Sequence, residues 1–230
     1  GLDQNLHKSD GFTNYSIFSL WDTYRALHPL YNLIQPTRNN DMMHSMMAHY
    51  DQSVHKALPI WSHYANENWC MIGYHSVSAL ADALTKGTTN LDPKRVLEAA
   101  IHSSNLSYYD GIESYLKYGY VPEDLNSASV SKTLEYAYDD WAIAQIAKLA
   151  GDKNAEQTYL KRAENYQNVY NPETGFMHPR LANGQFKKEF DPMDTHGQGF
   201  IEGNAFNYGL YVPQNISHMI SMMGGKDKFS

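Results

Sequence analysis

Several residue types and patterns are scarce in this chain of 230 residues, and each absence excludes a class of protein. Cys70 is the single cysteine, so the chain has neither a disulfide framework nor a thiolate metal site. It contains no apolar run of about 18 residues that could span a membrane, and its first residues lack the pattern of a signal peptide. With 18 basic against 25 acidic residues, and no basic cluster beyond Lys187 and Lys188, it is poorly suited to nucleic acid or an anionic membrane.

Common catalytic motifs are also missing from the sequence. There is no Gly-rich phosphate loop, no GxSxG nucleophile elbow and no HExxH zinc motif. His28, His75 and His196 are scattered along the chain, which argues against a zinc site. Carboxylate chemistry remains as the enzymatic option, and it points to glycoside hydrolysis.

The composition is that of an ordinary globular protein with many aromatic residues. Hydrophobic residues make up 42% of the chain and charged residues 19%, and the length suffices for one compact domain with a sizeable core. The 18 tyrosines and 4 tryptophans suit sugar rings, because flat aromatic rings stack on the apolar faces of sugars. The same residues would also fill helix–helix interfaces.

The spacing of apolar residues predicts helix after helix, with no strong strand pattern. Asp92 and Pro93 are expected to cap and open one of these helices. Between residues 171 and 200 the composition predicts a long loop, with a hairpin turn at Asn183 and Gly184. The predicted fold class is therefore all-α, built of helical hairpins with long loops. The expected helices cover residues 18–27, 39–55, 67–87, 93–107, 110–118, 129–150, 154–170, 202–211 and 213–223.

Glu67 begins the most informative stretch of the chain, which continues through Trp69 and Tyr74 to His75. Asn66 is expected to cap a helix whose first turn contains Glu67. Apolar and aromatic neighbours favour the protonated form of a carboxyl group, which is how a Glu serves as a general acid. The helix N-terminus favours the charged form instead, and a Glu in a first turn can also be a plain surface residue.

Two further clusters contain carboxylates beside aromatic residues. Trp21, Asp22 and Arg25 could hold sugar hydroxyls while a ring stacks on the sugar, or they could form a local ion pair on a helix. Glu135 and Asp139 lie one helical turn apart and could bind a polyol or a metal, or form a solvated acidic face.

The segment from Glu202 to Tyr208 offers only oxygen atoms as possible metal ligands. Glu202, Asn204 and Asn207 present carboxylate and amide oxygens, which are the ligands that calcium prefers. The same residues would also fit the start of a helix.

Four segments in this order, residues 18–30, 67–75, 134–141 and 202–205, closely resemble glycoside hydrolase family 92. The resemblance implies a calcium-dependent, exo-acting α-mannosidase, most simply an α-1,2-mannosidase, that inverts the anomeric configuration and removes terminal mannose from glycans. It also implies a bacterial protein of the periplasm, the cell surface or the secreted fraction. Mannose-containing glycans are thus the expected partners and Ca²⁺ the expected cofactor.

The resemblance also assigns roles to single residues. Glu67 matches the general acid of the family, and Asn207 falls in the segment associated with calcium. Relatives usually have the sequence Ala-Trp-Gln-Tyr at the position of Ala205 to Tyr208. This chain has Phe206 in place of the Trp and Asn207 in place of the Gln, so the side chain that carries the amide is shorter. The substrate-binding residues that we expect are Trp21, Asp22, Arg25, Trp69, His75, Glu135, Glu202 and Asn204.

Members of the family are considerably longer than this chain. They combine an N-terminal β-sandwich with an α/α-toroid, so residues 1–230 would form an incomplete toroid that lacks the sandwich and the end of the toroid. The Gly-Asn-Asp-Asp motif that supplies the general base is absent. An inverting glycosidase needs that second carboxylate about 6.5–9.5 Å from the acid, so we predict little or no turnover by these residues alone.

Other functions fit the same sequence. A non-catalytic carbohydrate-binding toroid would keep the aromatic residues with Asp22 and Arg25 but would not hydrolyse the sugar. A different toroid enzyme, such as a sugar epimerase or lyase, is a further alternative. In each case helix faces left without neighbours would favour self-association.

Overall fold

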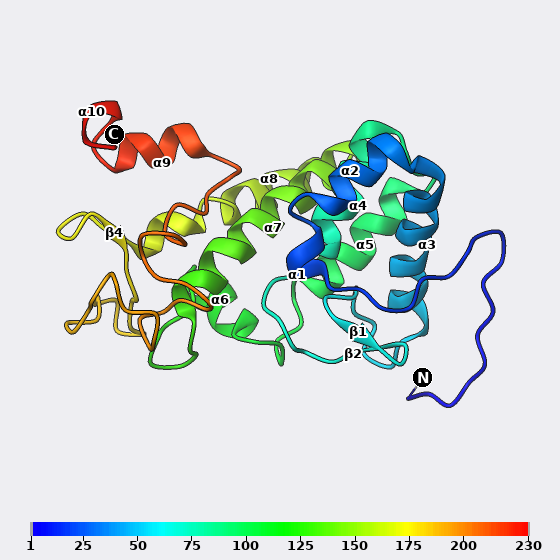
Figure 1. Cartoon of the computed structure of the whole chain (residues 1–230), viewed down its shortest axis with the longest axis horizontal. Helices are drawn as coiled ribbons and strands as arrows, with labels where there is room; N and C mark the ends of the chain where they lie inside the picture. The colour runs from blue at the N-terminus through cyan, green and yellow to red at the C-terminus, as the bar shows by residue number, and fades with distance from the viewer. Residues whose placement is uncertain (1, 230) are drawn as a thin grey trace. The chain divides into compact units, whose positions relative to one another are not determined.

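The computed structural model describes residues 2–229, which are mostly helical (Figure 1). Its contacts divide the chain into two compact units, Gly1–Leu106 with Asp139–Leu160 and Ser107–Tyr138 with Lys161–Ser230. We call them unit 1 and unit 2 and describe each by itself. The elements are α1 (Leu20–Thr23), α2 (Leu27–Ile34), α3 (Pro36–Gln52), β1 (Ser62–His63), β2 (Asn66–Glu67), α4 (Ser76–Lys86), α5 (Pro93–Ser103), α6 (Ile112–Tyr118), α7 (Ser129–Ala150), α8 (Lys153–Arg162), the 3₁₀-helix η1 (Asn165–Val169), β3 (Tyr170–Asn171), β4 (Phe176–Met177), α9 (Ile216–Met222) and α10 (Lys226–Phe229).

Unit 1 is built on the packing of α2, α3, α4 and α5. The methionines Met43, Met46 and Met47 recur at helical spacing on α3 and are buried, so this stripe is core. Val77 and Leu80 of α4 are fully buried on the facing side of this core. The short hairpin β1–β2 pairs Ser62–His63 with Asn66–Glu67 in the connection between α3 and α4.

The ends of these helices follow from local chemistry. The Asp92 carboxylate accepts the N–H of Lys94 at 3.1 Å and Pro93 opens α5, as predicted. Gly87 closes α4 in a left-handed conformation that a residue without a Cβ adopts at little cost.

Unit 2 surrounds the first half of α7, which spans residues 129–150 as predicted. Hairpin β3–β4 and the connection after it fold against this part of the chain, and α9 closes the core through Met219. An isolated bridge between Arg180 and Phe186 encloses the turn at Asn183 and Gly184, which confirms the predicted hairpin there. The core residues are Tyr120, Val130, Leu134, Ala137, Tyr166, Val169, Met177, Phe200, Ala205, Val212 and Met219.

The predicted helix at 67–87 exists as α4, but its predicted start is wrong. Residues 67–75 do not begin it, because Glu67 lies in β2 and α4 begins only at Ser76. Tyr64, Ala65 and Trp69 have positive φ angles of 50°, 57° and 62°, which an α-helix excludes.

The segment 202–211 is not helical either. Glu202 has a φ of 50°, and the residues after it form successive turns. The predicted helix at 18–27 is divided into α1 and α2, and Pro29 lies inside α2. It is tolerated there because the first backbone N–H groups of a helix have no partner within it.

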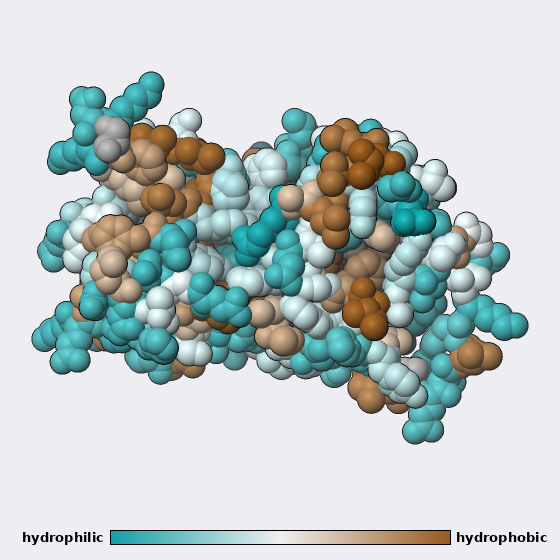
Figure 2. Space-filling model, viewed as in Figure 1, coloured by the Kyte–Doolittle hydropathy of each residue, from teal (hydrophilic) through white to brown (hydrophobic). Residues whose placement is uncertain are grey.

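One face of α2 remains apolar and exposed. Leu30, Leu33 and Ile34 are 45%, 73% and 58% exposed, and Leu27 contributes to the same face. Figure 2 shows these apolar side chains gathered over α2. Such a face is typical of a surface that another apolar surface covers.

Candidate active site

Glu67 sits at the end of the β1–β2 hairpin, with only 5% of the residue exposed. Its carboxylate accepts four backbone N–H groups. Ile60 donates to Oε2 at 2.5 Å and Trp61 to both oxygens at 3.0 and 3.1 Å. Asn68 and Trp69 each donate to Oε1 at 3.0 Å. Both oxygens therefore act as acceptors, and the side chain organises the loop on either side of the hairpin.

The predicted sugar-binding residues around α1 lie together in unit 1. The Arg25 guanidinium lies 4.8 Å from the ring centre of Trp21 and 4.9 Å from that of Tyr24, and its Nε donates to the Trp21 carbonyl at 3.0 Å. Asp22 accepts a short hydrogen bond from the Ser19 hydroxyl, and no ion pair joins Asp22 to Arg25 among the described residues. Arg25 and Asp22 are exposed, so both can meet a ligand.

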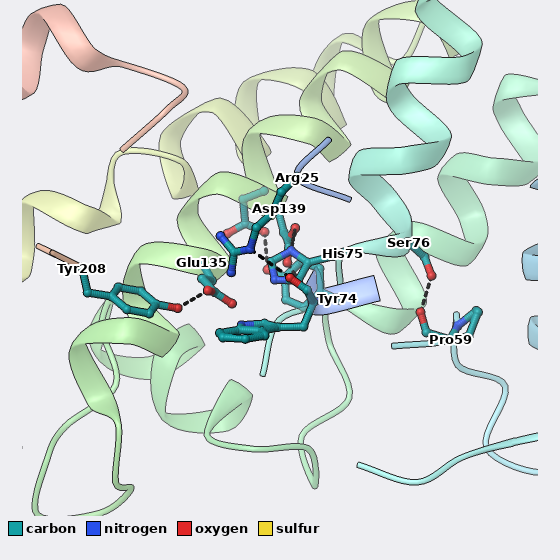
Figure 3. Close-up of polar contacts among 10 residues, drawn as sticks. Arg25, Pro59, Tyr74, His75, Ser76, Glu135, Asp139 and Tyr208 are labelled. Atoms are coloured by element: carbon teal, nitrogen blue, oxygen red, sulfur yellow. Dashed lines mark hydrogen bonds and ion pairs between the residues drawn. The ribbon is translucent and has the colours of Figure 1, made fainter. Parts of the chain in front are cut away.

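His75, predicted to bind substrate, is fully buried as the residue that precedes α4. Its Nδ1 lies 2.8 Å from Asp139 Oδ1, and the Tyr74 N–H donates to the other Asp139 oxygen at 2.7 Å. The Tyr74 hydroxyl donates to Asp140 at 2.8 Å, and the Tyr24 ring stacks on the imidazole with the ring centres 4.0 Å apart. Figure 3 shows His75 and Tyr74 beside Asp139. These contacts form a buried polar network rather than a sugar-contacting surface.

Glu135 lies on α7 in unit 2 and is buried. The Tyr208 hydroxyl donates a short hydrogen bond to Glu135 Oε1 (Figure 3). The Tyr208 ring in turn lies 6.1 Å from the rings of Phe200 and Tyr211. Sequence reasoning missed Tyr208 as a partner of Glu135, because the two residues are 73 positions apart and no local pattern joins them.

The segment predicted to bind calcium is a turn held by its own amides. Asn204 Oδ1 accepts the N–H groups of Phe206 and Asn207 at 3.1 and 3.3 Å, and Asn207 Oδ1 accepts the Asn204 N–H at 2.8 Å. Calcium takes about 6–8 oxygen ligands, and both amide oxygens already accept backbone donors. The described residues contain no group of three or more His, Cys, Asp or Glu side chains placed to hold a metal. These residues by themselves would therefore supply only part of a calcium site.

His28, His75 and His196, the three histidines considered above for a zinc site, have separate surroundings. His28 is buried, its Nδ1 lies 3.4 Å from Asn39 Oδ1, and burial lowers its pKa. His75 belongs to the network around Asp139, and His196 is exposed. Each of the three therefore lies in a different local environment.

No helix in residues 2–229 is both long and apolar enough to cross a membrane.

Comparison with known proteins identifies the family. The model of the glycosyl hydrolase family 92 catalytic domain matches residues 1–230. The chain resembles the family GH92 α-mannosidase BT3965 from Bacteroides thetaiotaomicron with 49% identity and a TM-score of 0.94, covering all of this chain and 30% of that one. The same mannosidase has also been solved in complex with mannoimidazole, at a TM-score of 0.95.

Two more relatives extend the comparison. The family GH92 inverting mannosidase BT2199 from Bacteroides thetaiotaomicron is 35% identical, with a TM-score of 0.84 over 91% of this chain and 29% of that one. An uncharacterized secreted glycosidase of Arthroderma benhamiae is 24% identical over 68% of this chain and 25% of its own length. The chain thus spans about a third or less of the length of these relatives. Since the family model covers every residue, the chain belongs to the glycosyl hydrolase family 92 catalytic domain family.

Proposed function

We propose that these 230 residues are the central part of the catalytic domain of an exo-acting α-mannosidase that removes terminal mannose from glycans, with α-1,2 linkages as the first substrate to test. The observation that supports this most is the match of the whole chain, at 49% identity, to an α-mannosidase of the same family. That relative binds mannoimidazole, a mannose-like ligand. The proposed architecture is part of an α/α-toroid, to which the remainder of a longer protein adds the missing helices and a β-sandwich.

The proposed reaction inverts the anomeric configuration, as the name of the BT2199 relative states for that enzyme. One carboxyl group protonates the leaving oxygen, and a carboxylate on the opposite face of the sugar activates water. We propose that the present residues supply the acid and that the base comes from another part of the longer protein. The chain alone is then expected to release little or no mannose.

Two glutamates compete for the role of acid, and their contacts separate them. Resemblance favours Glu67, but a general acid must present a proton to the substrate, and both Glu67 oxygens accept backbone N–H groups. Glu135 accepts the Tyr208 hydroxyl at Oε1 and is the alternative acid among the present residues. We propose Glu67 as the acid on the basis of the resemblance, with Glu135 as the candidate to test against it.

Leaving-group dependence distinguishes the two glutamates in the complete enzyme. If Glu135 is the acid, Glu135→Gln lowers hydrolysis of a mannosyl disaccharide by about 10²–10⁴-fold but largely preserves hydrolysis of an activated aryl mannoside, whose leaving group needs no proton. Glu98→Gln is a matched control, because its side chain is 64% exposed on α5. Equal losses on both substrates would exclude Glu135 as the acid.

We propose that Trp21, Asp22 and Arg25 contact the sugar, because Asp22 and Arg25 are exposed and the Trp21 ring is half-buried beside them. Trp69, Glu202 and Asn204 remain proposed substrate-binding residues on the basis of resemblance. Calcium dependence also remains part of the proposal, with Asn207 as its candidate ligand. Because the described residues do not complete a calcium site, no step of the reaction is assigned to the ion.

The first experiment is mannose release from α-1,2-mannobiose by this chain, with calcium and with chelator, beside the full-length BT3965 enzyme as active control. No release by the chain while the control is active would support an incomplete site. Calcium-dependent release would mean that the general base lies within these residues. Products other than mannose would favour an epimerase or a lyase.

A non-catalytic carbohydrate-binding role is the second candidate, and the exposed Arg25 beside Trp21 favours it. Titration of the chain with mannoimidazole separates the candidates. Binding without hydrolysis, by a complete protein as well as by this chain, would favour the binding role.

We also propose that the protein is bacterial and lies outside the cytoplasm. The two Bacteroides relatives support the bacterial origin, and the secreted fungal glycosidase supports the location. The apolar face of α2 supports self-association of the isolated chain. Light scattering across a concentration series tests this, and replacement of Leu33 by Glu should shift the chain towards the monomer.

A further inference from the structure

We propose that His75 is a positioning residue: held by Asp139 and stacked on Tyr24, it fixes the place of the Arg25 guanidinium at the surface of unit 1. A further consequence, that the positioned Arg25 contacts a sugar, rests on the proposed function, whereas the positioning itself does not. Figure 3 shows three members of this arrangement, Arg25, His75 and Asp139, close together.

The imidazole of His75 is anchored first. Asp139 is fully buried and uses both carboxylate oxygens, one for His75 Nδ1 at 2.8 Å and one for the Tyr74 N–H at 2.7 Å. An ionised carboxylate only accepts hydrogen bonds, so the proton between the two groups lies on Nδ1. The two bonds together fix the orientation of the carboxylate and hence of the ring.

Gly73 then closes the space around the imidazole. A Cβ at this position would lie 2.3 Å from His75 Nε2, and the φ angle of Gly73 is +83°. Any other residue would therefore collide with the ring and would also be strained. The backbone of Gly73 thus lies directly against the imidazole.

Tyr24 transmits this fixed position to the surface. The residue is 5% exposed, and its ring stacks on His75 with centroids 4.0 Å apart and an angle of 14° between the planes. The Arg25 guanidinium lies 4.9 Å from the centre of the same Tyr24 ring and 4.8 Å from that of Trp21. An exposed arginine ordinarily samples many rotamers. In Arg25, by contrast, contacts with two aromatic rings and the hydrogen bond to the Trp21 carbonyl restrict the side chain strongly.

Burial separates the roles of His75 and Arg25. His75 is 0% exposed, and further protein around the unit can only cover it more. It therefore acts through Tyr24 and does not contact a ligand itself. Arg25 is exposed and is the member of the series that can.

The test measures the order of the Arg25 side chain directly, without sugar. The Arg25 Nε–H signal of the isotopically labelled chain is identified by its loss in Arg25→Lys, which is simple because the chain has five arginines. Exchange of this proton with solvent is then compared among variants. Tyr24→Leu and Asp139→Asn should each accelerate it about tenfold or more, whereas Tyr24→Phe should restore the wild-type rate because it keeps the ring.

A destabilised control separates positioning from general loosening. Leu80→Ala removes buried core from α4 without touching the stack, so it should lower the melting temperature while leaving the Arg25 signal unchanged. The proposal is overturned if Tyr24→Leu leaves the exchange rate unchanged, or if Leu80→Ala accelerates it equally.

The sugar-binding role of Arg25 is tested by a separate experiment. In the complete enzyme, Arg25→Gln should raise KM for mannobiose by about tenfold or more with kcat little changed, and Tyr24→Leu should raise KM in the same direction. An unchanged KM in Arg25→Gln, together with ordered Arg25 in the exchange experiment, would refute the sugar contact but not the positioning.

Discussion

Each of the two units contains a two-stranded hairpin next to a buried titratable side chain. The two side chains differ in how the contacts that stabilise the hairpin are distributed. In unit 1 the residue is Glu67, in β2 itself. It is an acceptor for the backbone N–H groups of four residues, two of them before the hairpin and two after it. The stability of this loop is therefore concentrated in one carboxylate.

In unit 2 the residue is His178, directly after β4 and 3% exposed. Its Nε2 donates to the Lys187 carbonyl at 2.7 Å, and its Nδ1 lies 3.3 Å from the Asn171 amide and 3.4 Å from the Thr174 hydroxyl. The ring also stacks on Phe190 at 4.0 Å. Here the contacts are shared among several residues, and burial lowers the pKa of His178, which favours the neutral imidazole.

The comparison teaches that a buried titratable residue can hold a hairpin together by its hydrogen bonds. A carboxylate that already accepts several backbone N–H groups has fewer lone pairs left for a substrate, whatever its sequence neighbours are. The contacts made by each oxygen are therefore better evidence for catalysis than aromatic residues nearby in the sequence. Substitutions in both hairpins test this difference.

Glu67→Gln should have the largest effect on stability. The glutamine NH₂ group would replace one carboxylate oxygen, and it cannot accept the backbone N–H groups that now donate to that oxygen. Each buried N–H group left unpaired costs about 1–3 kcal/mol. We expect the free energy of unfolding to fall by about 3–5 kcal/mol, measured by denaturant titration. Glu98→Gln, exposed on α5, should change it little. A loss no larger in Glu67→Gln than in this control would mean that water satisfies the amides and that Glu67 is free to act as an acid.

His178→Leu should have the next largest effect. The Lys187 carbonyl and the Asn171 amide would both lose a partner, although leucine keeps part of the packing on Phe190. We expect a loss of about 1–3 kcal/mol in the free energy of unfolding. His196→Leu is the control, because His196 is exposed in the same unit. Equal effects of the two substitutions would contradict the structural role of His178.

The distance along the sequence between contacting residues explains which parts of the fold could be predicted. Helix α7 was predicted with its observed bounds because its apolar spacing and the following Gly151 are local signals. Asp92 likewise caps α5 through a bond two residues along the chain. In contrast, Glu67 bonds Ile60 and Trp61 across a hairpin, so a helix pattern drawn from its neighbours could not predict its place.

The candidate site was predictable in residue types but not in contacts. Trp21 and Arg25 lie together because they are one helical turn apart. The pairs of Glu135 with Tyr208 and of His75 with Asp139 join residues 73 and 64 positions apart, respectively. Only the packed structure determines such pairs, so His75 was predicted as a substrate contact although it is buried.

Acidification should weaken the His178 hairpin by a smaller amount. The pKa of His178 is lowered from 6.5 by burial, so the unfolded chain takes up its proton first as the pH falls. The stabilisation is complete above pH 6.5 and is lost as the pH falls towards the folded pKa, by at most about 1.4 kcal/mol for each pH unit. Buried His28 and His49, whose pKa values are also lowered, should add to the loss in the same direction.

Denaturant titrations from about pH 7.5 to about pH 5 measure this dependence, and the His178→Leu variant should show a shallower slope than the wild type. An unchanged slope in the variant would mean that His178 titrates normally in the folded chain, and the contrast with the Glu67 hairpin would then be wrong.

Thr174→Val should have the smallest effect. The Thr174 hydroxyl lies 3.4 Å from both His178 Nδ1 and the Asn171 carbonyl, at the limit of a useful hydrogen bond. Valine keeps the shape of the side chain, so we expect a loss of about 0.5 kcal/mol or less in the free energy of unfolding. Thr158→Val on α8, which removes a 2.8 Å bond to a helix carbonyl, is the control. A loss above about 1 kcal/mol in Thr174→Val alone would show that this hairpin, like that of Glu67, depends on a single contact, because shared contacts predict that removal of one leaves the others in place.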